Sequence, residues 1–263
     1  MPHRVVELES ARNPRVQEIR RAASSGRPTD DGLLVAEGPH LVDELLQSPW
    51  TVETIVLTAE TLPLWEHRTR LAGIETIVLP HKTFAAIAAT ETTQGVLALA
   101  RPYQYEWRDI FTPGCIALVM DGIQDPGNAG TIIRSAEAFG ASGVVLLRDC
   151  VRISNPKLMR ASAGSVFRVP LIESVALPDL LREVRSAGFR LVSLDASGDH
   201  SVREVNRADG LALVTGSEGR GVSPELLRQS ETVRIPTLKV ESLNAAVACS
   251  LALYELSRRR SDA

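Results

Sequence analysis

The chain has 263 residues, a formal net charge of −3 and a hydrophobic content of 44%, enough apolar material for one large core or two modest ones, and we favour two. No apolar run reaches the roughly 20 residues that a membrane-spanning helix needs, and the N-terminus MPHRVVELES lacks the apolar centre of a signal peptide. We therefore expect a cytoplasmic globular protein with no membrane partner, and the charge argues against a dedicated nucleic-acid coat protein.

Short apolar runs alternate with amphipathic helical patterns through the first half of the chain. The expected elements are, in order, a helix (16–25), a strand (33–38), a helix (39–48), a strand (54–60), a helix (62–73), a strand (76–80), a helix (82–90) and a strand (95–101). Each strand is rich in Val, Ile and Leu and is bounded by turn residues. This alternation predicts a small α/β unit with a mainly parallel sheet.

The segment RPYQYEWRDIFTPG breaks this rhythm with two prolines and a cluster of aromatic residues. We interpret it as an interdomain connection, with the linker proper at residues 106–114. Its aromatic side chains either stack on nucleic-acid bases or pack the linker onto a domain, and packing is the favoured interpretation. These aromatic residues are Tyr103, Tyr105 and Trp107.

The alternation resumes after the linker and continues to the end of the chain. The expected elements are a strand (115–122), a helix from about 129, a strand (143–149), a helix (155–164), a strand (168–172), a helix (177–188), strands (189–196 and 210–218), a helix (223–230), a strand (232–237) and a long helix from Ser242. Most of these strands are apolar throughout, as buried parallel strands are.

Three loops in this second half carry unusual residues at predicted carboxyl ends of strands, where open parallel sheets bind their ligands. They read DGIQDPGNAG (121–130), GSEGRG (216–221) and IPTLKVESLN (235–244). Each also has a purely structural interpretation, because their glycines supply positive φ angles and their polar residues cap helices or form ion pairs. The structural roles considered are N-caps at Asn128 and Ser242 and an ion pair between Arg134 and Glu137.

Other common site signatures are absent from the sequence. It contains no GxxxxGK[ST] phosphate-binding loop and no GxGxxG after the first strand of either half. The cysteines Cys115, Cys150 and Cys249 form no CxxC pair, and the five histidines are scattered, so we expect buried thiols, no disulfide framework and no metal site.

Taken together, NAGTIIR, TGSEGRGV and IP followed by ESLNAAVA resemble, in this order, the three motifs of the SpoU (TrmH) family. RASAGSVFRVP also looks like a segment of that family, and the resemblance covers residues 115–258. It implies an RNA ribose 2′-O-methyltransferase of the SPOUT class that uses S-adenosylmethionine. The rival hypotheses are a catalytically inactive RNA-binding protein of the same fold and a small-molecule α/β enzyme that uses a nucleotide.

The resemblance also implies a fold and a domain organisation. The fold is α/β, with a C-terminal parallel-sheet SPOUT domain at 115–263 whose chain forms a trefoil knot, a feature that topology rules would exclude. NPRVQEIRR and LLVAEGPHLVDELL resemble the substrate-binding domain that precedes it, here residues 1–105. The resemblance further implies a homodimer with the active site at the interface.

Site residues follow by matching the motifs position by position. The catalytic candidates are Asn128, Arg134, Glu218, Ser242 and Asn244. The cofactor-binding candidates, whose backbone contacts the adenosyl group in the family, are Gly216, Ile235 and Leu243. In the family the motif-one arginine is the proposed base, but a guanidinium stays protonated, so Arg134 can instead hold a phosphate and stabilise the developing alkoxide.

Two departures from the family pattern affect specificity. The segment IPTLKVESLN lacks a glycine and is one residue shorter than in many members, so its contacts at Thr237 to Val240 can differ. GRPTDDG replaces a basic run with two aspartates. We expect RNA, with ribosomal RNA preferred to transfer RNA; the nucleotide, and whether it serves housekeeping or antibiotic protection, stay open. The expected RNA-binding residues are Arg12, Arg15, Arg20, Arg21 and Arg27.

Overall fold

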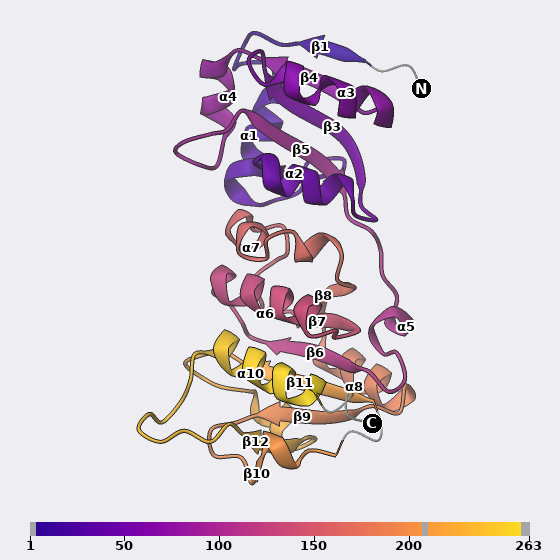
Figure 1. Cartoon of the computed structure of the whole chain (residues 1–263), viewed down its shortest axis with the longest axis vertical. Coiled ribbons are helices and arrows are strands. Elements are labelled where there is room, and N and C mark those ends of the chain that lie inside the picture. Colours follow the sequence, from indigo (N-terminus) through magenta and orange to yellow (C-terminus); the bar gives the residue numbers. More distant parts are fainter. Residues whose placement is uncertain (1–3, 207–209, 259–263) are drawn as a thin grey trace. The chain divides into compact units, whose positions relative to one another are not determined.

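A computed structural model describes residues 4–206 and 210–258 of the chain (Figure 1). The chain divides into two compact units: an N-terminal unit of Met1–Gln104 with Ser154–Phe167, and a C-terminal unit of Tyr105–Ile153 with Arg168–Ala263. Within the described ranges, every helix is too short or too polar to cross a membrane.

The N-terminal unit contains a five-stranded sheet in the order β1-β4-β3-β5-β2. Its strands are β1 (Val5–Glu7), β2 (Leu34–Glu37), β3 (Thr51–Thr58), β4 (Glu75–Leu79) and β5 (Val96–Arg101). Its helices are α1 (Pro14–Ser25), α2 (Pro39–Leu46), α3 (Leu62–Ala72) and α4 (His81–Ile87). Strand β5 runs antiparallel to both of its neighbours, while β1, β3 and β4 pair in parallel. The sheet is therefore mixed rather than mainly parallel, because β5 enters it between β3 and β2 in the opposite direction.

Local sequence explains how α1 begins and ends. The Asn13 side chain accepts a hydrogen bond from the Arg15 N–H, Pro14 starts the first turn, and Gly26 ends the helix at φ 62°. The buried face of α1 joins the core of the unit with side chains from β2, β3 and β5. That face consists of Val16, Ile19, Ala22 and Ala23.

A segment from the second half of the chain belongs to the N-terminal unit. It carries α7 (Pro156–Ala161) and a 3₁₀ turn whose last residue, Phe167, is fully buried with its ring centroid 5.1 Å from that of Trp50. The helix expected at residues 155–164 ends at Ala161 because Ala163 and Gly164 adopt φ angles of 49° and 90°, which a right-handed helix cannot contain.

The C-terminal unit is built on a seven-stranded sheet with parallel pairings, in the order β10-β12-β9-β11-β6-β7-β8. Its strands are β6 (Ile116–Asp121), β7 (Gly143–Leu147), β8 (Leu171–Val175), β9 (Arg190–Leu194), β10 (His200–Ser201), β11 (Leu211–Gly216) and β12 (Glu231–Arg234). Its helices are α5 (Trp107–Ile110), α6 (Pro126–Ala138), α8 (Leu177–Ser186), α9 (Pro224–Leu227) and α10 (Ala245–Arg258). The expected strand at 168–172 begins later, at Leu171.

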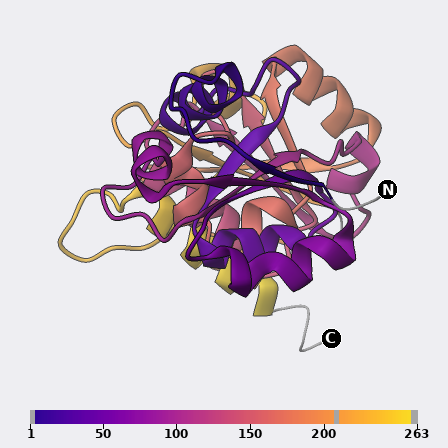
Figure 2. The same ribbon diagram turned by 90° about the horizontal axis from the view of Figure 1, so that it is seen from above.

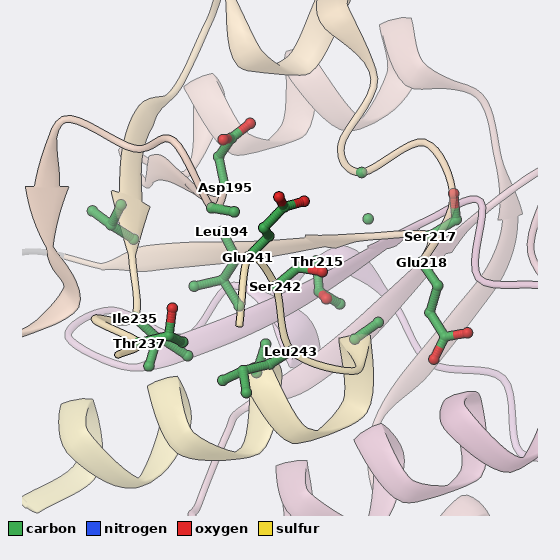
Figure 3. A pocket seen from close by; sticks show the side chains of 16 residues that line it. Leu194, Asp195, Thr215, Ser217, Glu218, Ile235, Thr237, Glu241, Ser242 and Leu243 are labelled. Carbon is green, nitrogen blue, oxygen red and sulfur yellow. The ribbon is translucent and has the colours of Figure 1, made fainter. Parts of the chain in front are cut away.

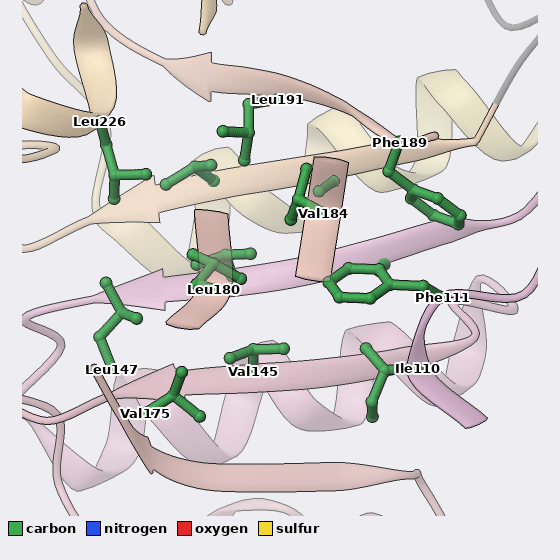
Figure 4. Close-up of a cluster of buried hydrophobic side chains, with 14 of the residues drawn as sticks. Ile110, Phe111, Val145, Leu147, Val175, Leu180, Val184, Phe189, Leu191 and Leu226 are labelled. Carbon is green, nitrogen blue, oxygen red and sulfur yellow. The ribbon is translucent and has the colours of Figure 1, made fainter. Parts of the chain in front are cut away.

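Helices cover both faces of this sheet. Alternate strand residues such as Val119, Val145 and Val214 share one buried cluster with Leu180 and Val184 of α8, and Figure 4 shows this cluster with α6 and α10 behind the sheet. The intervening strand residues face the opposite way, where α6 contacts β7 and α10 contacts β11. Burial on both faces explains why the central strands β6, β7 and β11 are largely apolar.

The predicted linker packs onto the C-terminal unit. The rings of Trp107 and Phe111 stack with centroids 5.8 Å apart, and Phe111 contacts Phe189 with centroids 5.0 Å apart. For Trp107 the structure therefore confirms the packing interpretation over a stacking platform for bases.

Two predicted helix starts are wrong. Helix α6 begins at Pro126, with Asp125 as its N-cap, because the Asp125 carboxylate accepts a hydrogen bond from the Asn128 N–H at 2.7 Å. Helix α10 begins at Ala245 rather than Ser242, and the Asn244 side chain caps it by accepting from the N–H groups of Ala246 and Val247 at 3.0 and 3.1 Å. The caps lie at Asp125 and Asn244, so Asn128 and Ser242 do not have that role.

Replacement of Leu180 by alanine tests the packing of α8 on the sheet. Leu180 is fully buried in the cluster of Figure 4, so Leu180→Ala is expected to lower the unfolding free energy by about 2–5 kcal/mol. The fully exposed Leu238 provides the control, since Leu238→Ala should change stability by less than about 0.5 kcal/mol. Urea denaturation followed by circular dichroism measures both, and equal effects would contradict the described packing.

Candidate functional site

The site lies where β6, β9 and β11 end, since these three neighbouring strands deliver their carboxyl-terminal loops to the same edge of the sheet. The loops after β6 and β11 are two of the three segments singled out in the sequence, DGIQDPGNAG and GSEGRG. The third segment, between β12 and α10, extends away from the rest of the C-terminal unit in both views (Figures 1 and 2).

The loop after β6 presents Asn128 from the first turn of α6. Asp125 fixes this turn through its bond to the Asn128 N–H. Asp121, at the end of β6, accepts a hydrogen bond from the Ser223 N–H at 2.6 Å and so ties this loop to the chain that follows β11. Asp121 and Asp125 thus hold this loop in place at its two ends.

The loop after β11 is a tight turn that presents Glu218. Ser217 and Gly221 exchange backbone hydrogen bonds of 3.1 and 2.8 Å, and Gly221 adopts a φ of 65°. A Cβ atom on Gly216 would lie 2.0–2.1 Å from backbone atoms of Gly221 and Val222, so only glycine fits there. The glycines of GSEGRG therefore serve close backbone approach at Gly216 and a left-handed turn at Gly221.

Three polar side chains from the three segments meet at this edge. The Asn128 amide donates a hydrogen bond to Glu218 Oε1 at 3.0 Å, and the Asn244 amide donates both to Asn128 Oδ1 at 3.0 Å and to Glu218 Oε1. The second carboxylate oxygen of Glu218, Oε2, has no hydrogen-bond partner among the described residues. Glu218 therefore joins the other two residues and still offers one acceptor atom.

A pocket of about 250 Å³ opens beside this group and is shown in Figure 3. Ser217 and Glu218 border one side of it, Ile235 and Thr237 the opposite side, and Leu243 its base. The three cofactor-binding candidates line this pocket, as do the catalytic candidates Glu218 and Ser242. We call it the cofactor pocket; its remaining lining residues are Leu194, Asp195, Ala196, Thr215, Gly221, Val233, Glu241, Ala245 and Ala248.

Arg134 stands apart from this group. It lies on the exposed surface of α6, lines neither the cofactor pocket nor the neighbouring pocket at Asn128, and has no hydrogen-bond or ion-pair partner among the described residues. Its expected partner Glu137 instead binds Arg168, with Nε and Oε1 2.5 Å apart. The ion pair between Arg134 and Glu137 is therefore a wrong prediction.

The sequence analysis missed the loop after β9, which contributes Leu194, Asp195 and Ala196 to the cofactor pocket. Asp195 Oδ1 accepts hydrogen bonds from the N–H and the hydroxyl of Ser197 at 2.7 and 2.6 Å. Strand order was the missing information: β9 pairs with β11, and a neighbour of the GSEGRG strand must end at the same edge.

Two of the cysteines, Cys150 and Cys249, are not nucleophiles at this site. Burial raises the pKa of Cys150 to about 11 and that of the fully buried Cys249 to about 12, so both thiols stay protonated at neutral pH. Among the residues that the structure describes, no group of three or more His, Cys, Asp or Glu side chains is arranged to hold a metal ion.

The arginines predicted to bind RNA lie on and around α1. Arg15 donates hydrogen bonds to the Glu75 carboxylate and to the Thr54 hydroxyl, which lies 3.3 Å from Arg15 Nη2. The hydrogen bond from Arg15 to Glu75, together with the positive charge of Arg15, lowers the pKa of Glu75. Arg21 pairs with Asp30 at 2.6 Å. The other three have exposed side chains without an ion-pair partner in the described part of the chain; they are Arg12, Arg20 and Arg27.

Comparison with profiles of known protein families identifies the family to which this chain belongs. The "SpoU rRNA Methylase family" profile matches residues 115–254, and the "MRM3-like substrate binding domain" profile matches residues 13–98. The chain belongs to the SpoU rRNA methylase family, as its motifs indicated. The combined match agrees with a smaller α/β unit ahead of a SpoU unit.

Individual relatives extend over nearly the whole chain. It is 31% identical over 252 residues to the Bacillus subtilis protein named 23S rRNA (guanosine(2553)-2′-O)-methyltransferase RlmP, covering 95% of this chain and 98% of that one. An AdoMet-bound rRNA methyltransferase from Sinorhizobium meliloti superposes with a TM-score of 0.86 at 30% identity, covering 97% and 98%. The AdoMet complex of the SpoU methyltransferase AviRb from Streptomyces viridochromogenes gives 0.84 at 26% identity, covering 95% and 99%.

Replacement of Gly216 tests whether the close packing of the Gly221 and Val222 backbone against Gly216 shapes the cofactor pocket. In Gly216→Ala the new methyl group must displace the backbone of Gly221, so we expect S-adenosylmethionine affinity to fall more than about tenfold, or ~1.4 kcal/mol. Gly219→Ala, where a Cβ meets nothing within 4 Å, should bind the cofactor as wild type does. Isothermal titration calorimetry measures both, and unchanged binding in Gly216→Ala would contradict this description.

Proposed function

We propose that this protein transfers a methyl group from S-adenosylmethionine to a ribose 2′-hydroxyl of RNA, with ribosomal RNA as the substrate. One observation carries the proposal: Glu218 lines the cofactor pocket and also accepts hydrogen bonds from Asn128 and Asn244. A donor bound in the pocket would therefore lie beside polar groups that can hold a hydroxyl. Membership of the SpoU family and likeness to RlmP support the reaction and the ribosomal substrate.

The residues of the cofactor pocket suit S-adenosylmethionine. Gly216, Ile235 and Leu243 line the pocket and can give an adenosyl group backbone and apolar contacts, while the carboxylates of Asp195 and Glu241 suit the positively charged parts of the cofactor. Gly216 has room for no side chain, because the backbone of Gly221 and Val222 packs directly against it and closes this wall of the pocket. When bound, the cofactor supplies an electrophilic methyl group on a sulfonium, and no metal is needed for this chemistry.

The chain's own polar residues act on the acceptor. Glu218 Oε2 can accept a hydrogen bond from the ribose hydroxyl and take up its proton, while the amides of Asn128 and Asn244 fix the carboxylate in place. Ser242, which also lines the pocket, adds a hydroxyl donor. Such positioning is effective because well-oriented reactants avoid roughly 7–11 kcal/mol of entropic and solvent cost.

Arg134 completes the site through a homodimer. Helix α10 exposes an apolar stripe at positions i, i+4 and i+7, made of Val247, Leu251 and Tyr254, with exposed fractions of 45–47%. Tyr254 contacts Phe139, the C-cap residue of α6, with ring centroids 5.7 Å apart, so the stripe reaches the C-terminal end of the helix that carries Arg134. A second copy paired through this stripe brings a guanidinium to the interface, where it holds an RNA phosphate and stabilises the developing alkoxide.

The N-terminal unit serves to bind structured RNA. Residues 1–105 act as the substrate-binding domain, residues 106–114 as the linker and residues 115–263 as the methyltransferase domain, a division supported by the two family matches. Arg12, Arg20 and Arg27 have guanidinium groups available for phosphates, whereas Arg15 and Arg21 would exchange an existing ion pair for one. We also propose a trefoil knot in the C-terminal segment and, from the substrate, action in the cytoplasm.

Transfer of labelled methyl from S-adenosylmethionine tests the reaction. We expect wild type to label ribosomal RNA, and not transfer RNA, at an alkali-resistant ribose. Arg134→Ala should reduce the rate by about 10²- to 10³-fold, because it removes one charge that stabilises the developing alkoxide. The matched control Arg228→Ala, at an exposed arginine that lines neither pocket, should retain full activity.

Label in transfer RNA alone would replace the ribosomal substrate by a transfer RNA. Cofactor binding without label in either RNA would count against the reaction on free RNA. Failure to bind S-adenosylmethionine would instead favour an inactive RNA-binding protein of this family.

Replacement of Leu251 tests the homodimer. A charge in the centre of the α10 stripe must be desolvated on pairing, so Leu251→Asp is expected to give a monomer with little methyl transfer. Leu64→Asp, at a leucine that is 74% exposed on α3, should remain dimeric and active. Light scattering coupled to gel filtration measures the mass, and a monomeric, active wild type would refute the proposal.

A further inference from the structure

A second pocket, with a volume of about 270 Å³, lies at the junction of the loops after β6 and β11. It shares Ser217 and Glu218 with the cofactor pocket, while Asn128 lines only the second pocket. A methyl transfer enzyme needs a donor site and an acceptor site that meet at the reacting atoms. Glu218, with its unoccupied Oε2, stands at the boundary between these two pockets.

Gly219 lines this second pocket. Unlike Gly221, it has no positive φ, and unlike Gly216 it has open space where a side chain would begin, since a Cβ atom there would meet no heavy atom within 4 Å. Backbone geometry and packing therefore do not require glycine here. A larger side chain at this position would occupy space at the pocket wall, and Gly219 does not line the cofactor pocket.

Two side chains of this pocket have no role in the site described above. Gln124 and Arg220 are exposed and have no side-chain hydrogen bond or ion pair with any described residue. The Gln124 amide offers a donor and an acceptor side by side, the combination that reads the edge of a nucleobase. Arg220 offers a planar cation that can stack on a base or bind a phosphate.

The remaining charged groups of the pocket are accounted for. Asp125 Oδ1 is engaged by the Asn128 N–H at 2.7 Å, and Glu218 Oε1 is engaged by two amides. Besides Glu218, whose Oε2 has no partner among the described residues, Gln124 and Arg220 can therefore contact a ligand that enters from outside. They come from different loops, Gln124 from the segment after β6 and Arg220 from the segment after β11.

We infer that this second pocket receives the acceptor nucleotide as an unstacked residue, with its ribose at Glu218 and Asn128 and its base against Gln124 and Arg220. The inference rests on the proposed function, because it assigns the acceptor half of that same reaction. Sequence-specific recognition of RNA usually reads bases that are splayed out of the stack. Gln124 then determines which base binds, and the lack of a side chain at Gly219 leaves room for that base.

Gly219→Leu tests the pocket directly. It should lower methyl transfer to unmodified 16S and 23S rRNA transcripts by more than about tenfold, with S-adenosylmethionine affinity within about twofold of wild type, because the leucine fills only the acceptor pocket. Gly219→Ala should show an intermediate loss. Full transfer by Gly219→Leu, or loss of its cofactor binding, would overturn the assignment.

Gln124→Ala tests base selection without filling the pocket. It should reduce kcat/KM for the transcript about 5- to 150-fold, the effect of losing one bidentate base contact, and relax the choice of modified base. The control Gln229→Ala, at an exposed glutamine outside both pockets, should match wild type. Wild-type kinetics and an unchanged modified base in Gln124→Ala would refute base reading, whereas absence of transfer by wild type would contradict the proposed function itself.

Discussion

The Glu218 carboxylate holds together three segments that are far apart in the sequence. One of its oxygens accepts hydrogen bonds from the amides of Asn128, in the first turn of α6, and Asn244, which precedes α10. Hydrogen bonds to a charged acceptor are about twice as strong as neutral ones, so this junction fixes the loops relative to one another. The shape of both pockets depends on it, because Glu218 lines each of them.

The parallel sheet makes that junction possible. Strands β9, β11 and β6 are neighbours, and their loops emerge at one edge, where β6 and β11 are also linked through Asp121 and the Ser223 N–H. These buried and largely apolar strands fix the positions of the loops. Several of the residues that line the cofactor pocket are small or apolar, and Gly216 among them has no room for a side chain.

The sequence predicts the local features well and the long-range ones poorly. Apolar runs predicted the positions of the strands. The order of the motifs predicted that Gly216, Ile235 and Leu243 belong to one site, and all three line the cofactor pocket. The capping role of Asp125 was missed because Asn128 is an equally good cap by type. The loop containing Asp195 was missed because strand order sets its position. Membership of the segment 154–167 in the N-terminal unit depends on distant contacts such as that between Phe167 and Trp50.

The central claim is that Glu218 organises methyl transfer, and comparison of Glu218→Ala with Glu218→Gln tests it most directly. Single-turnover transfer at saturating S-adenosylmethionine is the measurement. The account predicts a loss of at least about 10²-fold in Glu218→Ala, with partial recovery in Glu218→Gln, which restores one oxygen for the two amides but cannot accept the proton. Wild-type transfer rates in Glu218→Ala would contradict it.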